Sequence, residues 1–142
     1  NDGEAVIYDT PNEHVYSVTV NKNTNPHLES IQTIIKTKKL STFIEEQKLD
    51  HIDLIKMDVE THEPEVLEGM GEYLARFQPT FLIEILNDEV GKRVEDMIRN
   101  MGYLYFNIDE VNKPRLVNSL TKSDHYNYLL CKPEVAKRLN LL

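Results

Sequence analysis

Hydrophobic positions in the middle of the chain follow two alternating patterns. Residues 52–59 and 80–86 are apolar at almost consecutive positions, which is typical of strands covered on both faces. After each run, apolar residues recur at helical spacing, and Pro64 and Asn87 or Asp88 suit the two helix starts. The two stripes are Val66, Leu67, Met70, Leu74 and Phe77, then Val90, Val94, Met97, Ile98 and Met101. This order predicts a right-handed strand–helix–strand–helix unit of a parallel sheet.

The first third of the chain is predicted to form strands joined by polar loops. The candidate strands are residues 5–8, 15–20 and 31–35. A short helix through Glu46 is expected to follow, capped by Ser41 or Thr42. This part of the chain therefore predicts an N-terminal antiparallel β excursion.

Two more strands are expected near the carboxyl end, over residues 103–108 and 126–131. A long polar stretch joins them in place of a helix, so we expect them to be antiparallel, with one at the sheet edge. Pro133 suits the start of a last helix. The predicted fold class is α/β, with residues 1–142 in a single domain.

The composition is that of an ordinary folded protein, and it predicts neither a membrane-spanning segment nor an internal disulfide bond. No apolar run approaches the ~20 residues that span a bilayer, and no signal-peptide pattern is present. The single cysteine, Cys131, excludes an internal disulfide framework and fits a reducing, cytoplasmic location. Cys131 is expected to be a small core residue.

Charge is unevenly distributed along the chain, whose 24 acidic and 16 basic residues give a net charge of −8. The net charge is −3 over residues 1–50, −7 over 51–100 and +2 over 101–142. Six acidic residues and no basic ones lie between Lys56 and Arg76. Such a field repels phosphate backbones, so we expect no nucleic-acid partner.

The chemistry-bearing segment is the end of the first buried strand, Asp58-Val-Glu-Thr-His-Glu63. Ligands of open parallel sheets bind beyond the carboxyl ends of the strands. Asp58, Glu60, His62 and Glu63 have the groups to hold a cation, bind a ribose or deprotonate a hydroxyl. An equally weighted alternative is that Asp58 and Glu63 cap the following helix while Glu60 is solvated. The chain contains no Gly-rich phosphate loop and no G-x-S-x-G elbow.

The order of these residues resembles the FkbM-type S-adenosylmethionine-dependent methyltransferases. Ile52-Asp-Leu-Ile-Lys-Met-Asp-Val-Glu-Thr-His-Glu-Pro-Glu-Val-Leu-Glu-Gly69 is similar to the family's I-D-L-I-K-I-D-V-E-G, acid, E-V-L-x-G. Phe81-Leu-Ile-Glu-Ile85 after Pro79 resembles P-x-x-L-x-E-I. Upstream, Leu40-Ser-Thr-Phe-Ile44 resembles T-L-D-x-F/L, and Asp2-Gly-Glu-Ala-Val-Ile-Tyr8 resembles D-G-E-A-x-L-Y. Thr61 and Ser41 stand where the family has glycine and aspartate.

The resemblance implies a partial Rossmann-like methyltransferase sheet, strands 4-5-7-6 of the family order. The family's glycine-containing cofactor loop has no counterpart, so we expect the chain to be the carboxyl-terminal portion of a larger methyltransferase domain. It implies O-methylation of a hydroxyl on a sugar or secondary metabolite, the small-molecule acceptor. Asp58 and Glu60 would contact S-adenosylmethionine, and His62 or Glu63 would take the acceptor's proton. Binding of this cofactor by the chain alone is expected to be weak or absent.

Other predictions concern pairing across the sheet. Glu84 lies in a strand too apolar for an unpaired charge, so an ion pair with Lys56 on the neighbouring strand is expected. Asn127 is a candidate substrate contact, and an ordinary polar edge residue is the alternative. Strand 52–59 is expected to be covered by residues 5–8 and 15–20, or by another chain, which includes a homo-oligomer.

Two other functions remain open from the residues alone. One is an acidic metal-binding enzyme domain that uses Asp58, Glu60, His62 and Glu63, although no metal is assigned. The other is a non-catalytic interaction module that pairs with another polypeptide.

Overall fold

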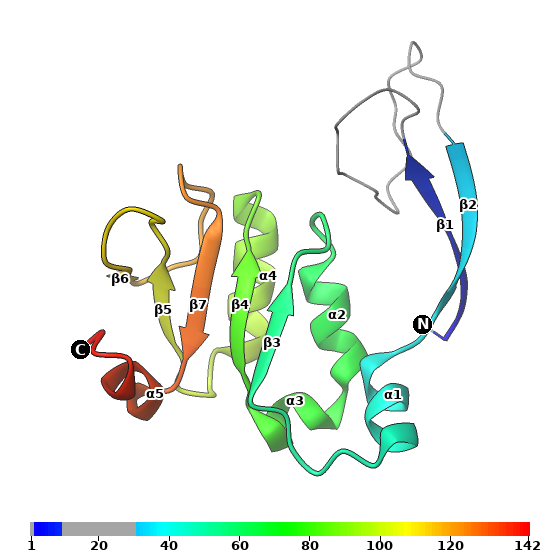
Figure 1. Ribbon diagram of the computed structural model, residues 1–142, viewed down its shortest axis with the longest axis horizontal. Coiled ribbons are helices and arrows are strands. Elements are labelled where there is room, and N and C mark those ends of the chain that lie inside the picture. Colours follow the sequence, from blue (N-terminus) through cyan, green and yellow to red (C-terminus); the bar gives the residue numbers. More distant parts are fainter. Residues whose placement is uncertain (1, 10–30) are drawn as a thin grey trace.

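The structure, a computed structural model, describes residues 2–9 and 31–142. These described residues form a two-stranded sheet and a five-stranded sheet with five helices (Figure 1). In chain order, the elements are β1 Gly3–Asp9, β2 Ile31–Thr37, α1 Leu40–Gln47, β3 Leu54–Met57, α2 Glu63–Met70, α3 Glu72–Phe77, β4 Thr80–Glu84, α4 Asp88–Ile98, β5 Leu104–Asn107, β6 Arg115–Val117, β7 Asn127–Cys131 and α5 Pro133–Arg138. The predicted strand over residues 15–20 lies outside the described residues.

The five-stranded sheet has the order β3-β4-β7-β5-β6. β3 and β4 are parallel, and β7 runs antiparallel to both β4 and β5. The predicted α/β class and the antiparallel pairing of the two carboxyl-terminal strands are confirmed. The expectation that one of these two strands lies at the sheet edge is wrong, because β7 and β5 both have neighbours on each side. The edge beside β5 is taken by β6, which was not predicted, since the polar stretch after residue 108 folds back as a hairpin.

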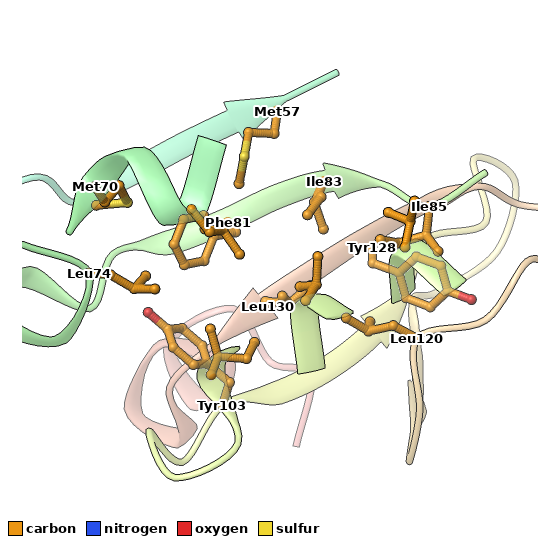
Figure 2. Packing of buried hydrophobic residues seen from close by; sticks show 14 residues of the cluster. Met57, Met70, Leu74, Phe81, Ile83, Ile85, Tyr103, Leu120, Tyr128 and Leu130 are labelled. Atoms are coloured by element: carbon orange, nitrogen blue, oxygen red, sulfur yellow. The ribbon is translucent and has the colours of Figure 1, made fainter. Parts of the chain in front are cut away.

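Alternating side chains of the strands pack on the two faces of the sheet. On one face, Met57, Phe81 and Ile83 join apolar residues of α2, α3 and α4 in the main core (Figure 2). On the other face, Phe106 and Cys131 pack against α5. Cys131 is therefore a buried core residue, as predicted. This period of two is what places polar residues at the strand ends on a defined side.

The predicted long helix after β3 is interrupted. Gly71 has φ +57°, a left-handed conformation that ends α2 and separates it from α3. Glycine adopts this conformation without the strain that a Cβ atom causes. The apolar stripe continues across the break, and both Met70 and Leu74 are buried in the main core.

The cap of α1 differs from the prediction. Neither Ser41 nor Thr42 precedes the helix, which begins at Leu40. The carboxylate of Asp2 instead accepts hydrogen bonds from the Lys39 backbone N–H at 2.7 Å and from the Thr42 hydroxyl at 2.8 Å. A residue distant in sequence thus supplies the acceptor that a helix N-terminus lacks.

β1 and β2 do not pair with β3. β1 pairs with β2 in register Gly3↔Thr37 to Asp9↔Ile31, and this hairpin projects from the body of the protein (Figure 1). Among the described strands, β3 has β4 as its single neighbour, and Leu54 is 59% exposed. None of the described helices is long and apolar enough to cross a membrane.

Candidate functional site

A tight turn joins the carboxyl end of β3 to α2. Glu60 and Thr61 have φ values of 52° and 76°, and the His62 N–H donates to the Val59 carbonyl at 3.2 Å. Two consecutive left-handed residues bend the chain back toward the helix. Thr61 adopts positive φ despite its branched side chain, a costly conformation for such a residue.

The Glu63 side chain supports this turn from inside. It is fully buried, and Oε1 accepts a hydrogen bond from the Val59 N–H at 3.4 Å. Oε2 is buried without a hydrogen-bond partner. Burial raises the pKa of Glu63, while backbone N–H groups of Glu63, Val59 and Thr61 and the charge of His62 act in the opposite direction. The carboxylate is therefore directed at the turn backbone rather than at open solvent.

The expected ion pair between Lys56 and Glu84 does not form within 4.0 Å among the described residues. The Lys56 ammonium instead contacts Asp58 Oδ2 at 3.0 Å. The reason lies in the strand register, because Lys56 pairs with Leu82 and Met57 with Ile83. One step further along both strands, Asp58 comes opposite Glu84. Periodicity along each strand does not report this two-residue offset between Lys56 and Glu84.

Glu84 therefore faces acids. Burial raises the pKa of Glu84, and Asp58, Glu60 and Glu63 raise it further through charge repulsion and a hydrogen bond with Asp58. A proton shared near Glu84 relieves part of this repulsion, as in other close carboxyl pairs. The sequence-predicted residues Asp58, Glu60 and Glu63 thus lie together, with Glu84 as a member that was assigned elsewhere. We call this group the acidic edge.

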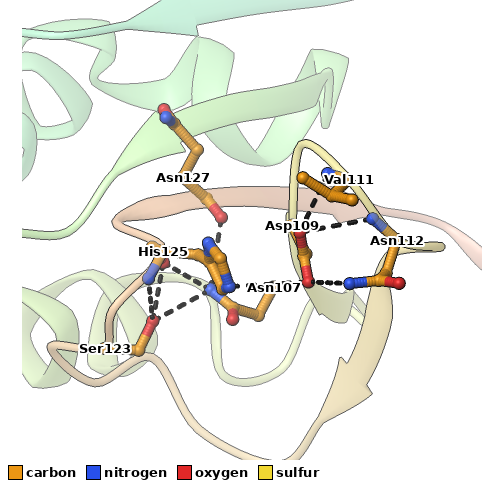
Figure 3. Close-up of polar contacts among 7 residues, drawn as sticks. All are labelled: Asn107, Asp109, Val111, Asn112, Ser123, His125 and Asn127. Carbon is orange, nitrogen blue, oxygen red and sulfur yellow. Dashed lines mark hydrogen bonds and ion pairs between the residues drawn. The ribbon is translucent and has the colours of Figure 1, made fainter.

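Asn127 extends the acidic edge across the sheet. It is the first residue of β7, is partly exposed, and pairs with Glu84 in the antiparallel ladder. Its side chain points away from the neighbouring Asn107 network (Figure 3). The predicted substrate contact is thus next to the acidic edge, at the same end of the sheet.

His62 takes a different direction. Its Nδ1 lies 3.2 Å from the Glu60 carbonyl oxygen, and the residue lines a cavity of about 510 Å³ between the end of β2, α1 and α2. Leu40, Phe43 and Val66 form apolar walls of that cavity. His62 is therefore near the acidic edge in sequence but contributes to a separate surface.

The acidic edge is not arranged as a metal centre. In the described ranges, no group of three or more His, Cys, Asp or Glu side chains is placed to hold a metal ion. The metal-binding alternative thus has no geometric support here. Repulsion among four carboxylates with Lys56 as the nearby cation favours an organic cation or a shared proton.

Glu84 could have been assigned from the sequence by a stricter rule. Asp58 and Glu84 both lie near the carboxyl ends of their apolar runs, 52–59 and 80–86, and the carboxyl ends of adjacent parallel strands meet at the same edge of a sheet.

Comparison with known proteins gives one match. The profile described as "Methyltransferase FkbM domain" matches residues 3–105, from β1 to β5. A search of curated proteins and a search of solved structures each returned no match.

Proposed function

The chain belongs to the FkbM methyltransferase family, and from this premise we propose that it serves methyl transfer from S-adenosylmethionine to a hydroxyl group of a sugar or secondary metabolite. In this proposal β3, β4, β5 and β7 correspond to strands 4, 5, 6 and 7 of the family sheet. The observation that carries it is the acidic edge at the carboxyl ends of two adjacent parallel strands, β3 and β4.

The residues present fit a cationic cofactor. S-adenosylmethionine carries a sulfonium and an ammonium group, and when bound it supplies an electrophilic methyl group. The acidic edge has an excess of negative charge over Lys56, and Glu63 Oε2 is buried without a partner. A positive group near these carboxylates would relieve their repulsion. Asp58 and Glu60 are the members we assign to this contact.

Glu84 is the member best suited to receive the acceptor's proton. An ordinary carboxylate is a weak base near neutral pH, and a raised pKa brings it closer to working conditions. Burial and the neighbouring acids raise the pKa of Glu84, whereas Glu63 is enclosed by the turn. We therefore assign proton acceptance to Glu84 in place of His62 or Glu63.

Glu63 and Thr61 act on the geometry of the site. The turn that contains Thr61, and that the Glu63 carboxylate holds from inside, sets the positions of Asp58 and Glu60 after the end of β3. Positioning of the reacting groups provides a large part of the acceleration in a two-substrate displacement. Their role in the proposal is to hold the acidic edge, without contact to the reacting atoms.

The test is methyl transfer by the protein as encoded, with labelled S-adenosylmethionine and a panel of hydroxylated acceptors. Asp58→Asn preserves shape and removes charge, so we expect a loss of about tenfold or more in kcat/KM or in cofactor affinity. The matched control is Asp53→Asn, since Asp53 is exposed at the opposite end of β3.

Two results would contradict the proposal. One is no cofactor-dependent methylation of any acceptor by a folded protein. The other is an Asp58→Asn variant with unchanged turnover and a melting temperature lowered by many degrees, since this identifies Asp58 as a structural residue.

A further inference from the structure

A polar cavity of about 430 Å³ lies where the β5–β6 hairpin meets the loop before β7 (Figure 3). Its walls include Asn107, Asn112, Lys113, Arg115, Ser123 and His125. The size is in the range of small-molecule sites. Asn107 ends β5, so the cavity lies at the same end of the sheet as the acidic edge.

The wall of this cavity is built around a buried amide. Asn107 is 3% exposed, and its Nδ2 donates to the His125 carbonyl at 2.6 Å and to Ser123 Oγ at 3.2 Å. The Ser123 hydroxyl also donates to the His125 carbonyl at 2.6 Å. These contacts fix the loop that presents Ser123 and His125 to the cavity.

The opposite wall is organised by Asp109. Its carboxylate accepts hydrogen bonds from the Val111 N–H at 2.9 Å, the Asn112 N–H at 3.2 Å and Asn112 Nδ2 at 2.7 Å. Oδ2 also lies 3.5 Å from His125 Nε2. The Asp109 carboxylate therefore interacts with N–H groups of its own loop and with the His125 ring.

The remaining charges of the cavity are mainly positive. Lys113 and Arg115 form no ion pair within 4.0 Å among the described residues, and Asp124 is the one further acid in the lining. The chain is strongly acidic overall, and residues 101–142 are its only third with a net positive charge. Arginine, lysine and amide donors together suit the recognition of an oxyanion.

We propose that this cavity binds an oxyanionic group, a phosphate monoester or a carboxylate, carried by a small molecule. Arg115 and Lys113 supply the charge, and Asn112 supplies a neutral donor through the second N–H of its side-chain amide, since the first is donated to Asp109. Two oxygens of the anion suit the planar guanidinium of Arg115, which binds such groups through paired hydrogen bonds.

The position of the cavity links it to the acidic edge, and this step rests on the proposed function. A second cavity of about 310 Å³ shares Asp109, Asp124 and His125 with the first and reaches Asn127. Asn127 in turn is paired with Glu84. An anionic acceptor would be repelled by the acidic edge and attracted by Lys113 and Arg115, so its charged end would lie in the cavity and its hydroxyl toward Glu84.

The test measures binding without cofactor. Amide chemical shifts of the ¹⁵N-labelled chain are followed during titration with glucose 1-phosphate, glucuronate and uncharged glucose at constant ionic strength. We expect either anion to shift residues 107–125 while glucose at the same concentration does not. The first two ligands distinguish phosphate from carboxylate recognition.

The variant Lys113→Gln/Arg115→Gln is expected to weaken anion binding about tenfold or more, because hydrogen bonds to charged groups are lost. The control Lys137→Gln/Arg138→Gln removes the same charge from α5, outside the cavity lining, and should leave binding within twofold. Arg115→Lys, which keeps the charge, serves if the double variant does not fold, and it should retain part of the affinity.

Equal affinity for glucose and glucose 1-phosphate would overturn the proposal. Anion-induced chemical-shift changes confined to residues outside the cavity would overturn it too, as would an equal loss of anion affinity in the two double variants. Failure of methyl transfer would leave these results unaffected, so the two proposals fail separately.

Discussion

Gly91 should be essential for packing, although it lies within a helix where alanine is normally preferred. A Cβ atom on Gly91 of α4 would lie 2.0 Å from the Leu120 carbonyl oxygen, 2.8 Å from its carbon and 3.3 Å from Ile85 Cγ2. The first two atoms belong to backbone, which rotation of a side chain cannot move. α4 and the segment at Leu120 must therefore separate in the variant Gly91→Ala.

The sign of the effect follows from two opposed contributions. Replacing glycine by alanine in a helix gains about 1 kcal/mol from propensity. Overpacking costs about 1–3 kcal/mol and more where backbone must shift. Separation also strains the hydrogen bonds from the Leu120 N–H to Glu95 and from the Lys122 N–H to Asp88 at 2.8 Å. We expect net destabilisation of about 2–4 kcal/mol.

Urea unfolding at constant temperature measures this difference, provided that the slope is unchanged between variants. The control is Gly69→Ala in α2, where the nearest atom to the added Cβ is the Leu40 nitrogen at an ordinary 3.7 Å. That variant should be as stable as the parent or more stable, by up to about 1 kcal/mol. A Gly91→Ala protein as stable as Gly69→Ala would refute the packing argument.

Three further predictions concern the polar end of the sheet. Burial and the neighbouring acids raise the pKa of Glu84 in the folded chain above its ordinary value, so its contribution to stability is present below the pKa of the unfolded chain and is lost as pH rises through the folded pKa. Glu84→Gln should therefore raise the melting temperature more at about pH 7 than at about pH 4.5. Equal increases at the two pH values would contradict a raised pKa of Glu84, as would the same pH dependence in the exposed control Glu89→Gln. Thr61→Gly relieves a left-handed threonine at the cost of chain entropy, so the urea midpoint should rise by an amount equivalent to about 0.5–1 kcal/mol, and a fall would show that Thr61 is not strained. Asn107→Ala leaves the Ser123–His125 loop without its buried donor and should cost about 1–3 kcal/mol in urea unfolding, whereas an unchanged midpoint would mean that this loop is held by other contacts.

The fold was predictable where local periodicity reports burial directly. The consecutive apolar runs gave β3 and β4, and the helical stripe with Asn87 gave α4, whose cap accepts the Val90 N–H at 2.9 Å. What failed depended on contacts between distant segments. The cap of α1 comes from Asp2, and β6 arises from a hairpin in a polar stretch that carries no strand periodicity.

The candidate site divides in the same way. Its position followed from the rule for strand ends, and Asp58, Glu60 and Glu63 were found as neighbours in sequence. The partner of Lys56 was wrong because register between parallel strands is set by packing of whole elements, which single residues do not report. The cavity near Asn107 was missed since its donors come from two loops of ordinary polar composition.

The buried polar side chains of the described residues lie at one end of the five-stranded sheet. Among the described residues, the buried polar side chains are Glu63 and Asn107, at 0% and 3% exposure. Glu63 begins α2 after the turn that follows β3, and Asn107 ends β5. Each side chain is hydrogen-bonded to the backbone of a segment that carries site residues. Burying such groups costs free energy unless they are hydrogen-bonded, and apolar residues would stabilise the fold at lower cost. Their placement is expected if the acidic edge and the cavity must be held in fixed positions relative to one another. A change that loosens either segment should then also displace the side chains of the proposed site. We therefore expect Glu63→Gln and Asn107→Ala to weaken ligand binding even under conditions where the variant protein is fully folded.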